Sequence, residues 1–211
     1  MNISSAIKEQ FEKIHHALET SNETLYKGVQ LYLSPLNQTE ILFIGINPGA
    51  GYFNHNNKRV KRLTPLKTFE YIGQKYYLAT QTKKVFIQLG LANVFKSAVK
   101  INHFPFSTKD EKDLNKLLHK YDTDFKLYYN SKQFVSETIK AVAPKLIICE
   151  GKSSFDRLKS FFTAEIVEYN ENTYIMKNDQ VVVIGYKRHL SQIKNKEEVK
   201  SKIKKYYKDS P

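Results

Sequence analysis

The order of apolar and polar segments predicts one α/β domain with three layers, in which helices flank a central, mainly parallel β-sheet. Short apolar runs at 41–46, 98–102, 145–151 and 181–185 end at glycine or polar residues, which is typical of buried parallel strands. Segments with helical spacing separate several of these runs, and such alternation favours helices layered on a parallel sheet. The 211 residues, 41% of them hydrophobic, suit one core, although length alone also allows two small domains.

The flanking elements follow from residue spacing. Apolar residues three and four apart predict an N-terminal helix over 3–19, further helices over 109–121, 131–141 and 152–162, and a basic C-terminal helix over 195–207. The segments 164–169 and 173–176 alternate and indicate a hairpin or a pair at the sheet edge. We expect a polar loop over 50–62, while 68–78 fits either a strand or a helix. The prediction is therefore one domain over 1–211, with a core at about 38–195.

The charge balance points to an anionic partner. The chain has 34 Lys and Arg against 21 Asp and Glu, a formal net charge of +13. This excess favours a polyanion, with nucleic acid ahead of a membrane surface, and the alternative is a solubilising surface. The last basic cluster, over 194–208, alternates with glutamates, which favours a solvated helix face there.

Cysteine and histidine usage argues against metal and redox chemistry. The single cysteine, Cys149, lies in an apolar run and is expected to be a small buried side chain rather than a nucleophile. One cysteine excludes an intrachain disulfide and a four-cysteine cluster, and no His, Cys and carboxylate spacing indicates a metal site. No apolar segment reaches membrane-spanning length and no signal-peptide pattern is present. We expect a cytoplasmic monomer without membrane, metal or cofactor.

The first apolar run ends at Gly45-Ile46-Asn47-Pro48-Gly49, followed by Gly51. In open parallel sheets, ligands bind at the carboxyl ends of the strands, so Asn47 stands where such folds do chemistry. The glycine spacing does not fit the dinucleotide fingerprint, and the lysine of a phosphate-binding loop is missing. An asparagine cannot act as an acid or base, but it can hold a water molecule or an amide edge.

Four segments in order resemble the motifs of the uracil-DNA glycosylase superfamily. The Gly-Ile-Asn-Pro-Gly turn is similar to the first motif, in the form typical of the mismatch-specific and single-strand-selective branches. The segment 100–106, Lys-Ile-Asn-His-Phe-Pro-Phe, resembles the middle motif, and 144–152 resembles the strand-and-glycine segment that follows it. His189-Leu190-Ser191 resembles the final His-Pro-Ser motif, with leucine in place of proline. Together these segments cover about residues 40–195.

The resemblance implies a monofunctional enzyme that hydrolyses the N-glycosidic bond of uracil, or of a related damaged or mismatched base, with water as the nucleophile. It implies that Asn47 positions the water, that His189 stabilises the leaving base at O2, and that Asn102 reads the pyrimidine edge. Other base-binding positions implied by the resemblance are Phe53, as a stacking ring, and Gly45, Ile46, Pro48 and Gly49. The implied DNA-binding positions are Lys187, Arg188 and Lys194 on phosphates, Ile193 or Leu190 as the apolar wedge, and Ser191.

The chain also departs from the most active enzymes of this superfamily, which carry an Asp-Pro-Tyr-His turn where this chain has Asn47-Pro48-Gly49-Ala50. Without the carboxylate, slower chemistry is expected. Two other functions stay open: a non-catalytic nucleic-acid-binding member of the same fold, and an enzyme acting on a nucleoside or another small carbonyl compound. At single residues the alternatives are a turn cap for Asn102, a structural role for His189 and a core position for Phe53.

Overall fold

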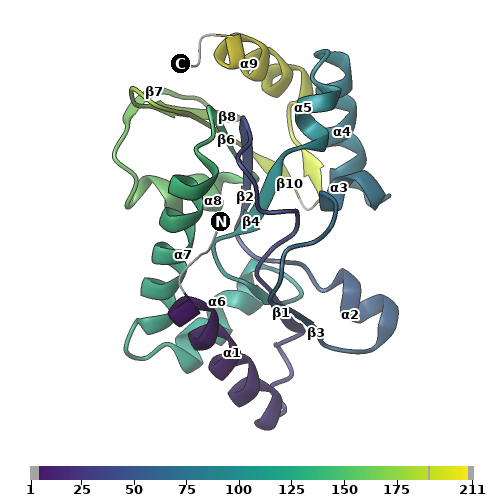
Figure 1. Cartoon of the computed structure of the whole chain (residues 1–211), viewed down its shortest axis with the longest axis vertical. Coiled ribbons are helices and arrows are strands. Elements are labelled where there is room, and N and C mark those ends of the chain that lie inside the picture. The colour runs from purple at the N-terminus through teal and green to yellow at the C-terminus, as the bar shows by residue number, and fades with distance from the viewer. Residues whose placement is uncertain (1–4, 190, 209–211) are drawn as a thin grey trace.

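The centre of the molecule is a six-stranded sheet with a mainly parallel order, as predicted (Figure 1). The computed structural model describes residues 5–189 and 191–208. Across the sheet the order is β4-β2-β6-β9-β8-β7; the first four strands are parallel and the last two are antiparallel. The strands are β2 (Ile41–Gly45), β4 (Val99–Asn102), β6 (Leu146–Cys149), β7 (Glu165–Tyr169), β8 (Thr173–Lys177) and β9 (Val182–Tyr186).

Both faces of this sheet are buried, which explains why its strands are continuous apolar runs rather than alternating ones. In β2, the side chains of Leu42 and Ile44 pack into one core cluster, and those of Ile41 and Phe43 pack into the other. The same alternation continues along β4, β6 and β9. The molecule is therefore an α/β domain in which the sheet separates two apolar layers.

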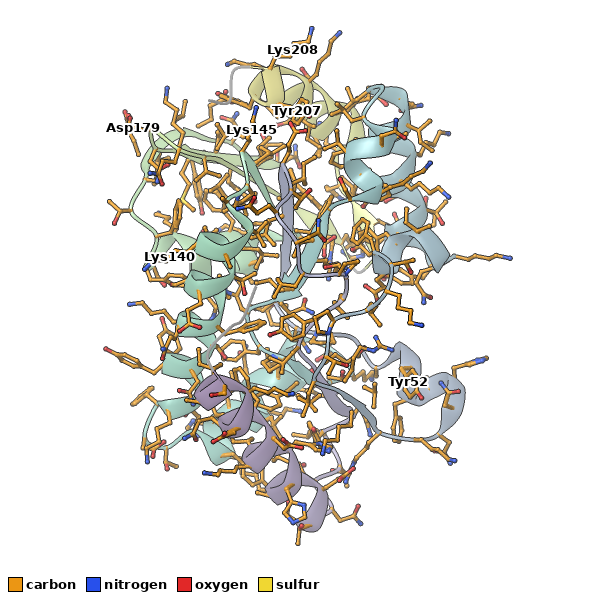
Figure 2. All side chains as sticks on the ribbon, viewed as in Figure 1. Tyr52, Lys140, Lys145, Asp179, Tyr207 and Lys208 are labelled. Atoms are coloured by element: carbon orange, nitrogen blue, oxygen red, sulfur yellow. The ribbon has the colours of Figure 1, made fainter. Side chains whose placement is uncertain are left out.

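Helices cover each face of the sheet (Figure 1). The face that carries Leu42 is covered by α1 (Ser5–Thr20), α6 (Glu111–Tyr121), α7 (Lys126–Val142) and α8 (Lys152–Lys159). The face that carries Phe43 is covered by α3 (Glu70–Gly73), α4 (Tyr77–Gln88), α5 (Ala92–Lys96) and α9 (Lys196–Lys208). The basic helix α9 lies at one end of the long axis, and Tyr52 lies toward the other, as the labels Lys208 and Tyr52 in Figure 2 show.

The prediction of a polar loop over 50–62 is wrong, because this segment contains the helix α2 (Gly51–Asn56) and the strand β3 (Val60–Arg62). β3 pairs in parallel with β1 (Gly28–Gln30), which the sequence analysis also missed, and β1 pairs with β5 (Phe106–Ser107). These three strands form a small second sheet. Each has only two or three residues, and its partner is far away in the chain, so local patterning gives no signal for it.

Other observed element boundaries differ from the predicted ones, and the local contacts explain the differences. Helix α7 begins five residues before the predicted 131, where the Asp122 carboxylate accepts the backbone N–H groups of Leu127 and Tyr128. It ends at Val142, and the next residue, Ala143, adopts the left-handed conformation with φ 48° just before Pro144. The ambiguous segment 68–78 contains the helix α3 and the start of α4, joined by a short non-helical link at 74–76. The predicted hairpin over 164–176 is confirmed as β7 and β8.

Two expectations about single features can be compared with the structure. Cys149 is fully buried, and burial raises the pKa of its thiol, so it is a core side chain as predicted. Within the described residues, every helix is too short or too polar to cross a membrane.

Candidate functional site

A pocket of about 500 Å³ lies at the carboxyl ends of the parallel strands. Its walls come from the ends of β2, β4 and β6, from α2 and α3, and from the small sheet. Such a position and size are typical of ligand sites in parallel α/β folds. The lining residues are Gln30, Gly45, Ile46, Asn47, Pro48, Gly49, Gly51, Tyr52, His55, Asn56, Arg62, Glu70, Tyr71, Gln74, Tyr76, Leu78, Lys100, Asn102, Glu150, Arg188 and Ser191.

The floor of the pocket is a row of residues at one level of the sheet. Gly45 of β2 pairs with Asn102 of β4. On the other side of β2, Ile44 pairs with Cys149 of β6, so the next residues along the two strands, Gly45 and Glu150, also lie side by side. Because alternate side chains point to opposite faces, Asn102 and Glu150 project from the same face as Lys100. The fold thus collects an amide, a carboxylate and an ammonium group around a glycine.

Gly45 leaves the space in which these groups meet. A Cβ atom at this position would lie 2.2 Å from Asn102 Oδ1 and 3.6 Å from Glu150 Oε2. The first distance is far below van der Waals contact, so the observed position of Asn102 requires glycine here. The Asn102 oxygen therefore fills the space that the missing side chain leaves, and the Glu150 oxygen lies close to the same point.

Asn102 is the polar side chain with an unused hydrogen-bonding group at this floor. The residue is 3% exposed, and its Nδ2 atom has no hydrogen-bond partner among the described residues. Leaving a buried donor unpaired costs about 1–3 kcal/mol. Less than 1 Å² of this atom is exposed, so a ligand acceptor would remove that cost only after the Asn102 amide turns toward the pocket.

Glu150 is held by a buried network. Lys100 Nζ lies 3.0 Å from Glu150 Oε2 and 3.5 Å from Glu70 Oε2, and 3.7 Å from the centroid of the Tyr71 ring. The Tyr71 hydroxyl donates a hydrogen bond to Glu150 Oε1. Burial, together with the neighbouring Glu150 carboxylate, raises the pKa of Tyr71 well above its usual value, so this hydroxyl keeps its proton. Tyr76 donates to Glu70 at 3.2 Å and completes the network.

Asn47 lines the pocket, but its amide nitrogen is fully engaged elsewhere. Nδ2 donates to the carbonyls of Pro48 at 3.0 Å and Phe106 at 3.2 Å, and to Thr108 Oγ1 at 2.8 Å. These bonds tie the turn after β2 to the segment around β5. The side-chain oxygen, an acceptor, is the group that Asn47 can offer to a ligand or a water molecule.

Around Asn47 the predicted base-binding positions separate into two groups. Gly45, Ile46, Pro48 and Gly49 line the pocket with it, as the strand-end argument predicts. Phe53, the predicted stacking ring, is absent from the lining; it is partly buried, with Lys27 Nζ 4.4 Å from its ring centroid. Tyr52, the second residue of α2, lines the pocket instead; it is labelled in Figure 2.

The segment after β9 supplies only part of what was predicted. Arg188 and Ser191 line the pocket, whereas His189 is exposed on β10 (Arg188–His189), opposite Gln192 of β11 (Gln192–Ile193), and is not a lining residue. Lys187 pairs with Glu171 at 3.4 Å. Lys194 is exposed, and its backbone N–H donates to the carbonyl of Lys187.

The structure contradicts the role of Ile193 as an exposed wedge. Its side chain is 6% exposed and belongs to the core cluster beneath α4 and α9. The backbone N–H of Ile193 also donates to Gln81 Oε1 at 3.0 Å. The other wedge candidate, Leu190, lies outside the described residues.

The histidines and arginines around the pocket differ in what they contact. Burial lowers the pKa of His103 to about 3, and its Nε2 lies 2.9 Å from the Ser154 carbonyl, so it is a neutral structural residue. His55 lines the pocket from α2. Among the basic residues 58–62, Arg59 binds backbone carbonyls, including that of Glu23 at 2.7 Å. Arg62 lines the pocket and donates to Gln30 Oε1 at 2.8 Å.

Several pocket residues were missed by sequence reasoning. Glu150 directly follows β6 and Lys100 lies two residues before Asn102, so strand-end position and the period of two could have identified both. Tyr71, Gln30 and Arg62 reach the pocket from elements that the sequence analysis left ambiguous or missed, and no local pattern marks them.

Among residues 5–189 and 191–208, no group of three or more His, Cys, Asp or Glu residues is placed to hold a metal ion. The pocket instead has hydrogen-bonding groups at its floor, on Asn102 and Glu150, and two arginines in its wall, Arg62 and Arg188. This arrangement suits a polar, partly anionic ligand such as a nucleotide. No protein-family model matches this chain, and no curated protein matches it.

Proposed function

We propose that this protein is a DNA glycosylase with a uracil-DNA glycosylase-like fold, which hydrolyses the N-glycosidic bond of uracil or a related damaged or mismatched base. The observation that carries the proposal is that Asn47, Asn102 and Arg188 line one pocket. Asn47 and Asn102 belong to two of the motif-like segments, Arg188 directly precedes the last one, and the three residues meet at the carboxyl edge of the sheet. Such a meeting is what a glycosylase needs, because it must hold a base outside the helical stack.

The base would lie on the floor of the pocket. Asn102 lines the pocket, and its unpaired Nδ2 would donate to a base carbonyl once the amide turns toward the ligand. A site built to make such hydrogen bonds rejects bases that leave its buried groups unpaired. This supports recognition of a base with a carbonyl on its pairing edge, as uracil has.

The water nucleophile would be held by Asn47. Its side-chain oxygen accepts a hydrogen bond from water, but an amide cannot take the proton, so the proposed reaction is slow. Stabilisation of the leaving base then becomes the larger contribution. Arg188, as a cation in the pocket wall, is better placed for this than His189, which would have to move inward when DNA binds.

The proposed substrate is the nucleotide within DNA, and the proposed state of the enzyme is a monomer. The net charge of +13 supports a polyanion as partner, and Arg188 and Lys194 lie on the segment beside the pocket. The basic helix α9 lies at the far end of the molecule from Tyr52, so it is not assigned to this contact.

Incubation with single- and double-stranded oligonucleotides that contain uracil, hypoxanthine, xanthine or mismatched thymine tests the enzymatic proposal. Alkaline cleavage reveals the abasic product. Asn47→Ala and Asn102→Ala should lower the rate at least about tenfold, since each removes a contact to the reacting nucleotide. Asn93→Ala, an exposed asparagine on α5, is the matched control. Absence of product from every substrate would remove the enzymatic proposal.

A second candidate is a non-catalytic binder of nucleic acid with the same pocket. It is favoured by the engagement of Asn47 Nδ2 with its own chain. DNA affinity that falls steeply with salt, without product, would support this candidate. Replacing Arg188 by glutamine should then lower the slope of log K against log salt concentration by about one.

A further inference from the structure

We propose that Arg62 binds a phosphate of the bound nucleotide and so fixes the direction in which that nucleotide lies in the pocket. The ligand of the pocket is then a nucleotide, free or within DNA, rather than a nucleoside without phosphate. The inference rests on the proposed function and deepens it, because it adds an anion-binding residue to the same pocket. The motif resemblance gives Arg62 no such role.

Arg62 is held by a chain of hydrogen bonds that crosses all three strands of the small sheet. Its Nη1 atom donates to Gln30 Oε1 of β1 at 2.8 Å, and Gln30 Nε2 donates to Ser107 Oγ of β5 at 3.0 Å. Gln30 and Ser107 are both buried, so the support is fixed in the folded chain. A side chain that is already ordered loses less entropy when it binds a ligand. The small sheet therefore presents a pre-positioned guanidinium to the pocket.

The strand β3 directs only one of its two basic side chains toward the pocket. Along this strand Val60 is buried, Lys61 is exposed and Arg62 is half-buried. Because alternate side chains point to opposite faces, Arg62 shares the inward face of Val60. Lys61 points away and pairs with Glu12 at 2.7 Å. Arg62 lines the pocket and Lys61 does not, so the two neighbours form a matched pair for experiment.

The positive charge of Arg62 has no carboxylate partner among the described residues. The ion pairs in that part of the chain are formed by lysines and one histidine. The carboxylates of the pocket, Glu70 and Glu150, pair with Lys100 instead. Gln30 takes one of the N–H groups of the guanidinium. The others suit a phosphate, whose oxygens accept paired N–H donors from arginine.

The distribution of charge in the pocket gives the nucleotide its direction. A phosphate at the floor would meet the carboxylates of Glu70 and Glu150, and Lys100 offsets only one of these two negative charges. At Arg62 the same phosphate meets an unpaired cation. The uncharged base therefore lies toward the floor and the phosphate toward the small sheet. Arg188, the other arginine of the wall, is the one that the proposed reaction places at the leaving base.

Free ligands test the phosphate contact without requiring catalysis. Calorimetry or NMR titration compares 2′-deoxyuridine with its 5′-monophosphate and its 3′-monophosphate. One of the two monophosphates should bind at least about tenfold tighter than the nucleoside, as expected for hydrogen bonds to a charged group. Arg62→Gln should reduce this ratio to about threefold or less. Lys61→Gln removes the same charge from the neighbouring residue and should leave the ratio unchanged.

Single-stranded oligonucleotides test whether the phosphate belongs to DNA. Each contains one 2′-fluoro-2′-deoxyuridine, which resists hydrolysis, and carries an uncharged methylphosphonate on its 5′ side, on its 3′ side or on neither. One of the two methylphosphonates should weaken binding at least about tenfold. In Arg62→Gln the same replacement should weaken binding about twofold or less, because the contact is already missing. Lys61→Gln should show the full loss.

Arg62→Lys keeps the charge but loses the planar fork, and its phosphate effects should fall between those of the natural protein and Arg62→Gln. This variant keeps the test decisive if Arg62→Gln does not fold. Phosphate effects equal to those of the natural protein, in a folded Arg62→Gln or in Arg62→Lys alone, would overturn the inference. So would a nucleoside that binds as tightly as both monophosphates.

The outcomes also separate this inference from the glycosylase proposal. If uracil is excised while Arg62→Gln keeps the natural phosphate effects, the glycosylase proposal stands and the inference fails. If the effects depend on Arg62 but no base is excised from any oligonucleotide, the inference stands and the enzymatic proposal fails. If a free monophosphate is preferred but neither methylphosphonate weakens binding, Arg62 keeps its role toward a free nucleotide and DNA is removed as its source.

Discussion

At the scale of single residues, small changes of chemistry decide what the pocket can do. Gly45 contributes by having no side chain, since a Cβ there would overlap Asn102 Oδ1. Asn47 contributes an oxygen, because its nitrogen is bound to the chain. In both cases the neighbouring residues, and not the residue type alone, determine what the position contributes to the pocket.

Replacing Gly45 by alanine should weaken ligand binding while keeping the fold. The new methyl group would displace the Asn102 amide, so we expect ligand affinity to fall at least about tenfold. Titration with a single-stranded oligonucleotide that contains uracil measures the loss, and circular dichroism checks the fold. Gly73→Ala is the control, because nothing lies within 4 Å of its added Cβ and it is outside the pocket. Equal affinities for the two variants would contradict the proposed floor.

Replacing Asn47 by aspartate should destabilise the protein despite introducing a potential base. A carboxylate oxygen would face the carbonyls of Pro48 and Phe106 in place of the donor nitrogen. We expect the free energy of unfolding to fall by about 1–3 kcal/mol at neutral pH, and by less in acid, where the carboxyl group regains a donor. Urea unfolding at the two pH values measures this. A variant as stable as the natural protein would show that these hydrogen bonds carry little weight.

At the scale of elements, the hairpin β10–β11 is anchored by Ile193. The side chain packs into the core beneath α4 and α9, and the pocket residue Arg188 is on the paired strand. The anchor thus places the arginine beside the pocket. An exposed wedge at this residue would leave the hairpin without that support.

Replacing Ile193 by alanine should therefore lower stability rather than affect DNA contacts alone. We expect a loss of about 2–4 kcal/mol in the free energy of unfolding, as for other large-to-small changes in a core. Ile87→Ala, at a position 53% exposed on α4, should change it by less than about 0.5 kcal/mol. Unchanged stability with weakened DNA binding would restore the wedge assignment.

The elements also show how far sequence reasoning reaches. The parallel strands were predictable because burial on both faces makes them apolar runs, and the positions of Asn47 and Asn102 follow directly from the strand ends. The short strands β1 and β3 were not, because they are specified by distant pairing rather than by their own pattern. Phe53 and Ile193 were misassigned because the orientation of a side chain within a short element depends on packing that the sequence does not display.

At the scale of the whole molecule, stability in acid should depend on two carboxylates outside the pocket. Hydrogen bonds from the Leu25 backbone N–H and from Lys120 lower the pKa of Glu23 to about 2, and Lys202 and Tyr206 do the same for Glu168. Both contributions are complete above the ordinary value of 4.5. They are lost as the pH falls toward 2, because only the unfolded chain takes up protons in that interval.

Urea unfolding across this interval provides the measurement. The natural protein should lose stability steadily below pH 4.5, and Glu23→Gln should start less stable and lose less. A slope that is the same in both proteins would mean that Glu23 gains nothing from its partners in the folded state.

The pocket wall belongs to two sheets at once. Gln30 and Arg62 come from the small sheet, and Gly45 and Asn102 come from the large one. A ligand that contacts both would fasten them together, so part of its binding energy would appear as resistance to local opening of the chain. The amide hydrogens of β1 and β3, in an otherwise minimal sheet, should then exchange with solvent more slowly when the pocket is filled. The molecule would report occupancy of its pocket through strands that take no part in the proposed bond cleavage.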